Sequence, residues 1–229
     1  MVMKLQHRFV AGVRADTNVE YAIQGKRRLR FDDLHIQQSE LDGACGIVCT
    51  VQSAMILAGI RRNDAEEMSS AKTGPLHALW ALAKSTYFEG TTDRQIEAFV
   101  GAFKPQLKSK VSTNRSTKDL SQEIADAIDA GHVPILAVES RSWNHWTLVI
   151  GYERESGKSK PLALLCLDAS NSCPPWGVLY NARCALQPSA YGKNRKPKKY
   201  SLRYSSADGG LHHVRLHGLV IVTQGLSAV

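Results

Sequence analysis

Long hydrophobic runs and targeting signals are missing from this chain. No stretch approaches the roughly 20 consecutive apolar residues that a membrane-spanning helix needs. The first residues, MVMKLQHRFVAGVRAD, contain no long apolar block and no small-residue cleavage site, which argues against a secretory signal peptide. The sequence therefore predicts no membrane partner. It predicts a location in the cytoplasm, or secretion without a cleavable signal peptide.

Cysteine is scarce and irregularly spaced, and this excludes several other classes. Five cysteines without paired spacing form neither a disulfide framework nor a structural zinc motif, so we interpret them as reduced thiols. His212, His213 and His217 alternate along a strand-like segment, with no cysteine or carboxylate at ligand spacing. We therefore expect no metal site, and no other pattern calls for a cofactor.

The composition is that of a single globular domain. The chain has 229 residues, of which 43% are hydrophobic and 22% are charged, and its formal net charge is +8. It shows no internal repeat and no low-complexity linker, so we predict one domain over residues 1–229. The basic run GKNRKPKK at residues 192–199 contains no interleaved aromatic residue, which favours a solvated loop over a nucleic-acid site. Nothing in the sequence sets an oligomeric state.

The hydrophobic pattern changes from helical to extended along the chain. Helical periodicity dominates residues 37–131, where Thr92 and Thr117 are expected helix caps. From residue 132 to residue 229 the apolar residues follow strand-like runs, which include VPILAV, HWTLVIGY and PLALLCLD. Helices first and strands second predict an α+β fold, with the helices packed against one antiparallel sheet.

Residues 37–59, QQSELDGACGIVCTVQSAMILAG, predict a buried central helix. The stretch is apolar almost all round after its polar start, and a helix of that kind is buried. Asp42 and Gly43 are plausible residues for its N-terminal boundary, and Gly59 is a natural stop.

This helix would place Cys45 in its first turn. Unpaired backbone N–H groups and the positive end of the helix dipole favour a thiolate there, and the thiolate is the nucleophilic form of cysteine. Taken alone, a cysteine in such a helix is more often a small core residue. We interpret Cys49, one turn further on, in that way.

Two predicted strands flank the sequence RESGKS, and they carry a histidine and a carboxylate. His145 opens the first strand and Asp168 closes the second. If the hairpin turns at Ser156-Gly157, counting outward places His145 opposite Asp168 on one face of the sheet. The carboxylate would then accept the Nδ1–H of the imidazole and orient this ring as a base. Asn171 is the alternative orienting residue.

A glutamine upstream of the helix completes the predicted site. Attack on a carbonyl group generates an oxyanion, which needs hydrogen-bond donors. The side chain of Gln38 is the expected donor, with Gln37 as the alternative. The backbone N–H of Cys45 would be the second donor.

The order of these residues resembles the papain-like cysteine peptidase superfamily. The nearest similarity is to its bacteriocin-leader-processing branch, the double-glycine peptidases. The resemblance is carried by Gln38 and by the segments DGACGIVC, NHWTLVIGYE and LCLDAS. It implies a papain-like fold, in which an N-terminal helical part with a buried central helix (about 37–131) packs on a C-terminal antiparallel sheet (about 132–229). Two departures from the family pattern are that Asp42 is separated from Cys45 by two residues instead of being adjacent to it, and that Ala169, not proline, follows Asp168.

The sequence therefore predicts a cysteine peptidase that cleaves an amide bond of a protein or peptide through an acyl-enzyme. Cys45, His145 and Asp168 would form the catalytic triad, with Gln38 in the oxyanion hole. One alternative is deamidation or acyl transfer on a partner protein by the same residues, as in a bacterial effector or toxin. The second alternative is an inactive papain-like binding module whose basic surface contacts an acidic partner.

Overall fold

The computed structural model describes residues 4–10, 20–23, 27–30, 34–39, 43–113, 115–173, 180–187 and 199–225. Two predicted features fall outside these ranges: the helix boundary at Asp42 and residues 192–198 of the basic run. Across the described residues, no helix combines the length and the apolar character needed to cross a membrane.

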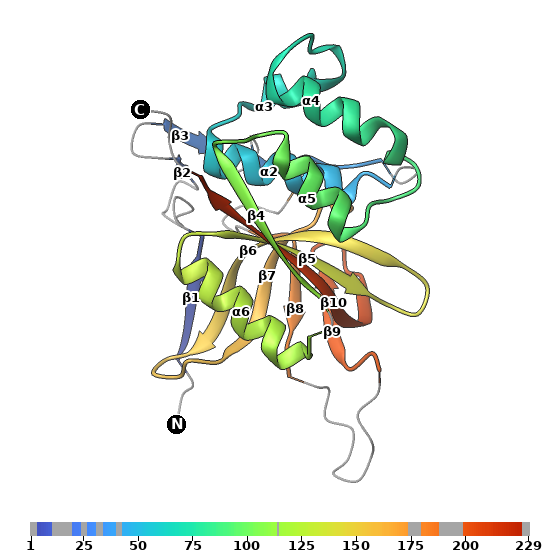
Figure 1. Ribbon diagram of the computed structural model, residues 1–229. Helices are drawn as coiled ribbons and strands as arrows, with labels where there is room; N and C mark the ends of the chain where they lie inside the picture. Colours follow the sequence, from blue (N-terminus) through green and yellow to red (C-terminus); the bar gives the residue numbers. More distant parts are fainter. Residues whose placement is uncertain are drawn as a thin grey trace.

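The core of the molecule is a β-sheet that closes on itself. Among the described residues, six antiparallel strands pair in the ring order β6–β5–β10–β9–β8–β7, and β7 pairs again with β6 (Figure 1). These strands are β5 (Val133–Glu139), β6 (Asn144–Glu155), β7 (Pro161–Leu167), β8 (Ala182–Ala185), β9 (Leu202–Ser206) and β10 (Leu211–Gln224). Two strands extend the ring: β1 (Leu5–Phe9) pairs with β6, and β4 (Leu107–Thr113) pairs with β10. A separate hairpin joins β2 (Glu20–Ile23) to β3 (Arg27–Arg30).

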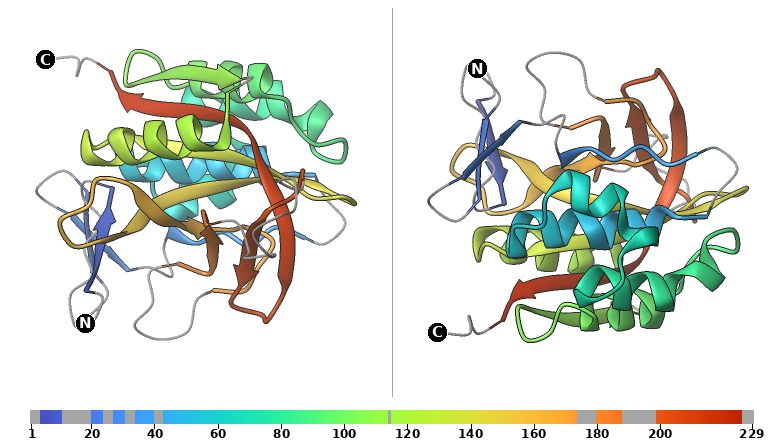
Figure 2. Two further views of the ribbon diagram at one scale, coloured as in Figure 1. Left: turned by 90° about the horizontal axis from the view of Figure 1, so that it is seen from below. Right: turned by 90° about the horizontal axis from the view of Figure 1, so that it is seen from above.

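This closed barrel contradicts the predicted papain-like α+β fold, in which helices pack on one open sheet. The pairing of β6 with β7 leaves no free edge between them, and β1 and β4 come from outside the C-terminal part of the chain. Strand β10 makes closure possible because it is long and bent: its start pairs with β9, and its later residues pair with β5 and β4. Figure 2 shows this curvature, and the register against β5 shifts between Leu216 and Gly218, as at a β-bulge.

The helices surround this barrel unequally. They are α2 (Cys45–Ala58), α3 (Arg62–Glu66), α4 (Gly74–Ala83), α5 (Asp93–Gly101) and α6 (Thr117–Asp129), with short 3-10 turns η1 (Met68–Ser70) and η2 (Lys84–Thr86). In Figure 1, α2 to α5 gather above the sheet, whereas α6 lies alone below them beside β1, β6 and β7. The predicted cap of α5 is confirmed, since Thr92 forms a capping box with Gln95. The cap of α6 is Ser116, not Thr117.

Helix α2 is the buried central helix that the sequence predicts. Every residue from Cys45 to Leu57 is buried, and Gly59 ends the helix in the left-handed conformation at φ 71°. The strand β6 beneath it is buried without interruption from Trp146 to Glu153. A strand buried on both faces fits its place here, because one face fills the barrel and the other lies under the helices.

The hairpin between β6 and β7 has a different register from the predicted one. Leu148 pairs with Leu167, so continuing the ladder places Thr147, not His145, opposite Asp168. The cause is that the connection is centred one residue later than the predicted turn, since the last pair before it is Arg154 with Pro161. The ladder is displaced by two residues relative to the prediction. A shift of two preserves the face of the sheet, so His145 and Asp168 still lie on the same side.

Candidate active site

The first turn of α2 presents the predicted nucleophile. Cys45 is the first residue of the helix, and no side chain caps this end. The backbone N–H groups of the first turn therefore have no side-chain cap, and that of Gly46 interacts with the thiol. Burial alone would raise the pKa of Cys45. The hydrogen bond and charge of His145, with the backbone N–H groups of Trp146 and Gly46, outweigh burial and lower it.

His145 stands at the start of β6 and connects Cys45 to Asp168. Its Nε2 lies 2.7 Å from Oδ1 of Asp168, so the pairing predicted from the sequence exists. The predicted ring nitrogen was wrong, because Nε2 rather than Nδ1 meets the carboxylate. Burial disfavours the imidazolium, but the charge and hydrogen bond of Asp168 and the contact with Cys45 raise the pKa of His145 to about 10. A protonated imidazole beside a thiol of lowered pKa is the arrangement of a thiolate–imidazolium pair.

Asp168 follows β7 and is 2% exposed. Both carboxylate oxygens are hydrogen-bonded: Oδ1 accepts from the backbone N–H of Ser170 at 2.8 Å, and Oδ2 accepts from the hydroxyl of Tyr204 at 2.6 Å. Burial would raise the pKa of Asp168, but the charge of His145 and these donors lower it below its ordinary value. The carboxylate is therefore held in its ionised form.

A second buried network fixes the backbone of Asp168. The side chain of Asn181 accepts from the Asp168 N–H at 2.6 Å and donates to its carbonyl oxygen at 2.7 Å. The ring of His35 lies 3.1 Å from the Asn181 amide nitrogen and 3.3 Å from the same carbonyl. The alternative orienting residue, Asn171, only contributes backbone groups to this network. It does not replace Asp168 as the partner of His145.

Gln38 approaches the site through its backbone. Its N–H donates to the carbonyl oxygen of Ala169 at 2.9 Å, next to Asp168. The carboxamide makes no hydrogen bond to Cys45 within the described structure, and its Oε1 is buried without a partner among those residues. Gln37 is exposed. Gln38 is therefore the better placed of the two glutamines, and its role in an oxyanion hole stays a prediction.

Thr91 links the elements that carry Cys45 and His145, and sequence analysis did not identify it. Its carbonyl oxygen accepts from the indole Nε1 of Trp146 at 2.7 Å. On the other side, a Cβ added to Gly46 would lie 2.0 Å from the Thr91 hydroxyl oxygen, so only glycine allows this approach. A Cβ on Gly43 would similarly meet the backbone of Gly90 at 2.4 Å. The two glycines in the sequence DGACG were the available signal.

Tyr204, Asn181 and His35 were also missed by sequence analysis. They come from segments far from His145 in the sequence, and nothing in their local pattern separates them from core residues. Trp143 lies two residues before His145. Its ring makes edge contacts with His145 and His212 at centroid distances of 6.2 and 5.3 Å. The indole of Trp143 therefore lies between the rings of His145 and His212.

The remaining candidates lie elsewhere. His212, His213 and His217 are exposed on β10, and in the described part of the chain no group of three metal-ligating side chains could hold an ion.

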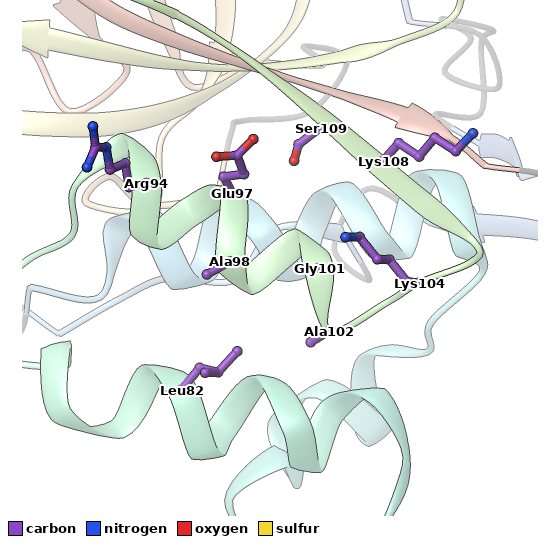
Figure 3. Close-up of a pocket in the computed structure, with 9 residues that line it drawn as sticks. All are labelled: Leu82, Arg94, Glu97, Ala98, Gly101, Ala102, Lys104, Lys108 and Ser109. Carbon is purple, nitrogen blue, oxygen red and sulfur yellow. The ribbon is translucent and has the colours of Figure 1, made fainter.

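A groove of about 760 Å³ lies between α4, α5 and β4, lined by Leu82, Glu97 and the cations of Arg94, Lys104 and Lys108 among others (Figure 3). None of the predicted site residues lines it. The groove is on the face of α5 that carries Arg94 and Glu97, whereas Ile96 points toward Gly46 of α2.

Comparisons with known proteins do not assign this chain to a family. No protein-family model matches the sequence, and no curated protein sequence matches it. The function must therefore be argued from the chemistry of the site.

Proposed function

We propose that the protein is a thiol hydrolase that cleaves an amide bond of a protein or peptide substrate. The proposal is supported chiefly by one observation: an unbroken chain of contacts runs from Cys45 through His145 to Asp168. Each pKa along the chain is displaced in the direction that such chemistry needs, since that of the thiol is lowered and that of the imidazole is raised. The reaction requires no cofactor.

In the first half-reaction, the Cys45 thiolate attacks the carbonyl carbon of the substrate, and the carbonyl electron pair moves to oxygen. The backbone N–H of Cys45, at the open end of α2, is a donor for this oxyanion, and Gln38 is the proposed second donor. The imidazolium of His145 then donates its proton to the departing amine nitrogen. The C–N bond breaks, and the acyl group remains on Cys45 as a thioester.

In the second half-reaction, water releases the acyl group. Neutral His145 takes a proton from the attacking water, the C–S bond breaks, and the thiolate and imidazolium are restored. Asp168 keeps the imidazole oriented and favours its protonated form in both halves. Asp168 itself stays ionised.

The first test is the alkylation of Cys45 by iodoacetamide as a function of pH, followed by mass spectrometry. We expect Cys45 to react faster than the other four thiols near pH 6, because its pKa is lowered while those of Cys49, Cys166 and Cys184 are raised by burial. Exposed Cys173 serves as the internal reference for accessibility. In His145→Ala this advantage should disappear. A Cys45 that titrates like an ordinary thiol near pH 8.5 would refute the proposal.

The second test identifies the reaction by its products. A peptide library should yield new amino termini with wild type and none with Cys45→Ala. Release of ammonia without chain cleavage would instead indicate deamidation by the same residues. A Cys45 of ordinary reactivity and neither product, together with retention of an acidic protein on the folded chain, would favour the binding module.

A further inference from the structure

We propose that Tyr204 is a positioning residue for Asp168: its hydroxyl holds the carboxylate in the orientation that His145 requires. This inference rests on the proposed function of Cys45 and His145. It adds a side chain from the far side of the barrel to the proposed triad of Cys45, His145 and Asp168.

The direction of the hydrogen bond follows from the distances. Tyr204 has one hydroxyl proton, and the nearest acceptor is Oδ2 of Asp168 at 2.6 Å. The second neighbour of the Tyr204 hydroxyl, Oγ1 of Thr147, is 3.4 Å away. The Thr147 hydroxyl in turn lies 3.4 Å from the carbonyl oxygen of Leu167. The phenol proton therefore belongs to the carboxylate. A neutral hydroxyl donating to a buried carboxylate forms a charge-assisted hydrogen bond, which is stronger than one between neutral groups.

Closure of the barrel is what brings Tyr204 to this point. In the ring order, β9 lies opposite β6, three strands away in either direction. Along β9, Leu202 and Tyr204 are buried while Arg203 is exposed, so the phenol points into the barrel. Its hydroxyl reaches Thr147 on the opposite strand and Asp168 just beyond β7. If the ring were opened between β6 and β7, three strand spacings, or roughly 14 Å, would separate β9 from β6.

The two carboxylate oxygens of Asp168 consequently have different hydrogen-bond partners. Oδ1 faces His145 and the Ser170 N–H, and Oδ2 faces Tyr204. With both ends held, the carboxylate cannot rotate away from the imidazole without breaking a buried hydrogen bond. The titratable groups that face Asp168 are His145 on β6, Cys49 on α2, Cys166 on β7, His35 ahead of α2 and Tyr204 on β9. Of these, only His145 and Tyr204 donate hydrogen bonds to its carboxylate among the described residues.

The alternative is that Tyr204 is an ordinary core tyrosine whose hydroxyl happens to find a partner. The chain offers a matched control for this reading in Tyr152. Tyr152 is 1% exposed, and its hydroxyl contacts both oxygens of Asp129, at 3.0 and 2.9 Å. Tyr152 lies on the same strand as His145 but further along it, and neither Tyr152 nor Asp129 contacts Asp168 among the described hydrogen bonds. Replacing either tyrosine with phenylalanine removes one tyrosine–carboxylate hydrogen bond and keeps the ring.

The test is a double-mutant cycle on the rate of Cys45 alkylation at pH 5 to 6. We expect Tyr204→Phe to slow alkylation about tenfold, which is the effect of losing a hydrogen bond to a charged group. In an Asp168→Asn background, the same substitution should change the rate less than twofold, because its effect passes through the carboxylate. Tyr152→Phe should leave the rate unchanged in both backgrounds. Equal effects of Tyr204→Phe with and without Asp168 would overturn the proposal.

A titration separates this inference from the proposed function. With ¹³C-labelled aspartate, the carboxyl pKa of Asp168 should rise by about one unit in Tyr204→Phe and stay constant in Tyr152→Phe. An unchanged pKa of Asp168 contradicts the role of Tyr204 even if Cys45 proves reactive. A shifted pKa with an unreactive Cys45 supports the hydrogen bond and rejects the hydrolase. In the wild type, a Tyr204 hydroxyl proton that exchanges freely with solvent would also overturn the proposal, without any variant.

Discussion

Two carboxylates at strand ends, Glu139 and Asp168, are held in opposite ways. Glu139 ends β5 near the surface, and fixed cations surround it. Arg215 forms an ion pair with it, Lys199 lies 3.1 Å away, and the Tyr200 hydroxyl donates at 2.9 Å. The hydrogen bond of Arg215 is the largest cause that lowers the pKa of Glu139 to about 2. The negative charge of Glu139 is therefore balanced by permanently charged neighbours at pH values above about 2.

Asp168 has no such excess of positive charge. In the described structure its only cationic partner is His145, whose own charge depends on Cys45 and on Asp168. The other donors, Ser170 and Tyr204, are neutral. A carboxylate paired with arginine stabilises a fold, whereas one whose partner can release a proton remains available for chemistry. This difference is why Asp168, and not Glu139, is included in the candidate site, although the pKa of each carboxyl is lowered.

The largest expected effect comes from neutralising each carboxylate in turn. Asp168→Asn should reduce peptide cleavage by about 10²- to 10⁴-fold, because the imidazole loses both its orientation and the charge that keeps it protonated. Glu139→Gln should change the cleavage rate less than twofold. The measurement is kcat/KM on a peptide that the library test shows to be cleaved, with circular dichroism to show that both variants are folded. Similar losses of kcat/KM in the two variants would mean that Asp168 matters no more for cleavage than Glu139 does.

The second effect concerns stability in acid. The pKa of Glu139 is depressed, so its contribution is present above the unfolded value near 4.5 and is lost as the pH falls toward about 2. Glu139→Gln should therefore cost about 1 kcal/mol at pH 6, after allowance for solvent screening of its exposed partners, and nothing near pH 2. Urea unfolding at pH 6, 4 and 3 measures the difference between variant and wild type. A difference that stays constant over this range would contradict the assigned cause.

Only part of the candidate site and of the fold can be predicted from the sequence alone. Cys45, His145 and Asp168 could be identified because each stands at the end of a strongly patterned element. A two-residue error in the hairpin register did no harm, because it left both side chains on one face. Closure of the barrel could not be predicted, since an alternating strand looks the same in an open and in a closed sheet. Tyr204 and Asn181 depend on pairings between distant strands, and no local pattern marks them.

The smallest effect should appear with added salt. The partners of Glu139 are partly exposed, with side-chain exposures of 35% for Arg215 and 58% for Lys199, so counter-ions can screen them. Raising the ionic strength from 0.05 to about 1 M should reduce the stability difference between Glu139→Gln and wild type by a few tenths of a kcal/mol. The alkylation rate of Cys45 at pH 6 should hardly change, because His145 and Asp168 are buried with side-chain exposures of 11% and 3%. The opposite result would be an alkylation rate of Cys45 that falls with salt and a stability difference of Glu139→Gln that does not. It would mean that the basic surface, and not the buried pair of His145 and Asp168, stabilises the thiolate.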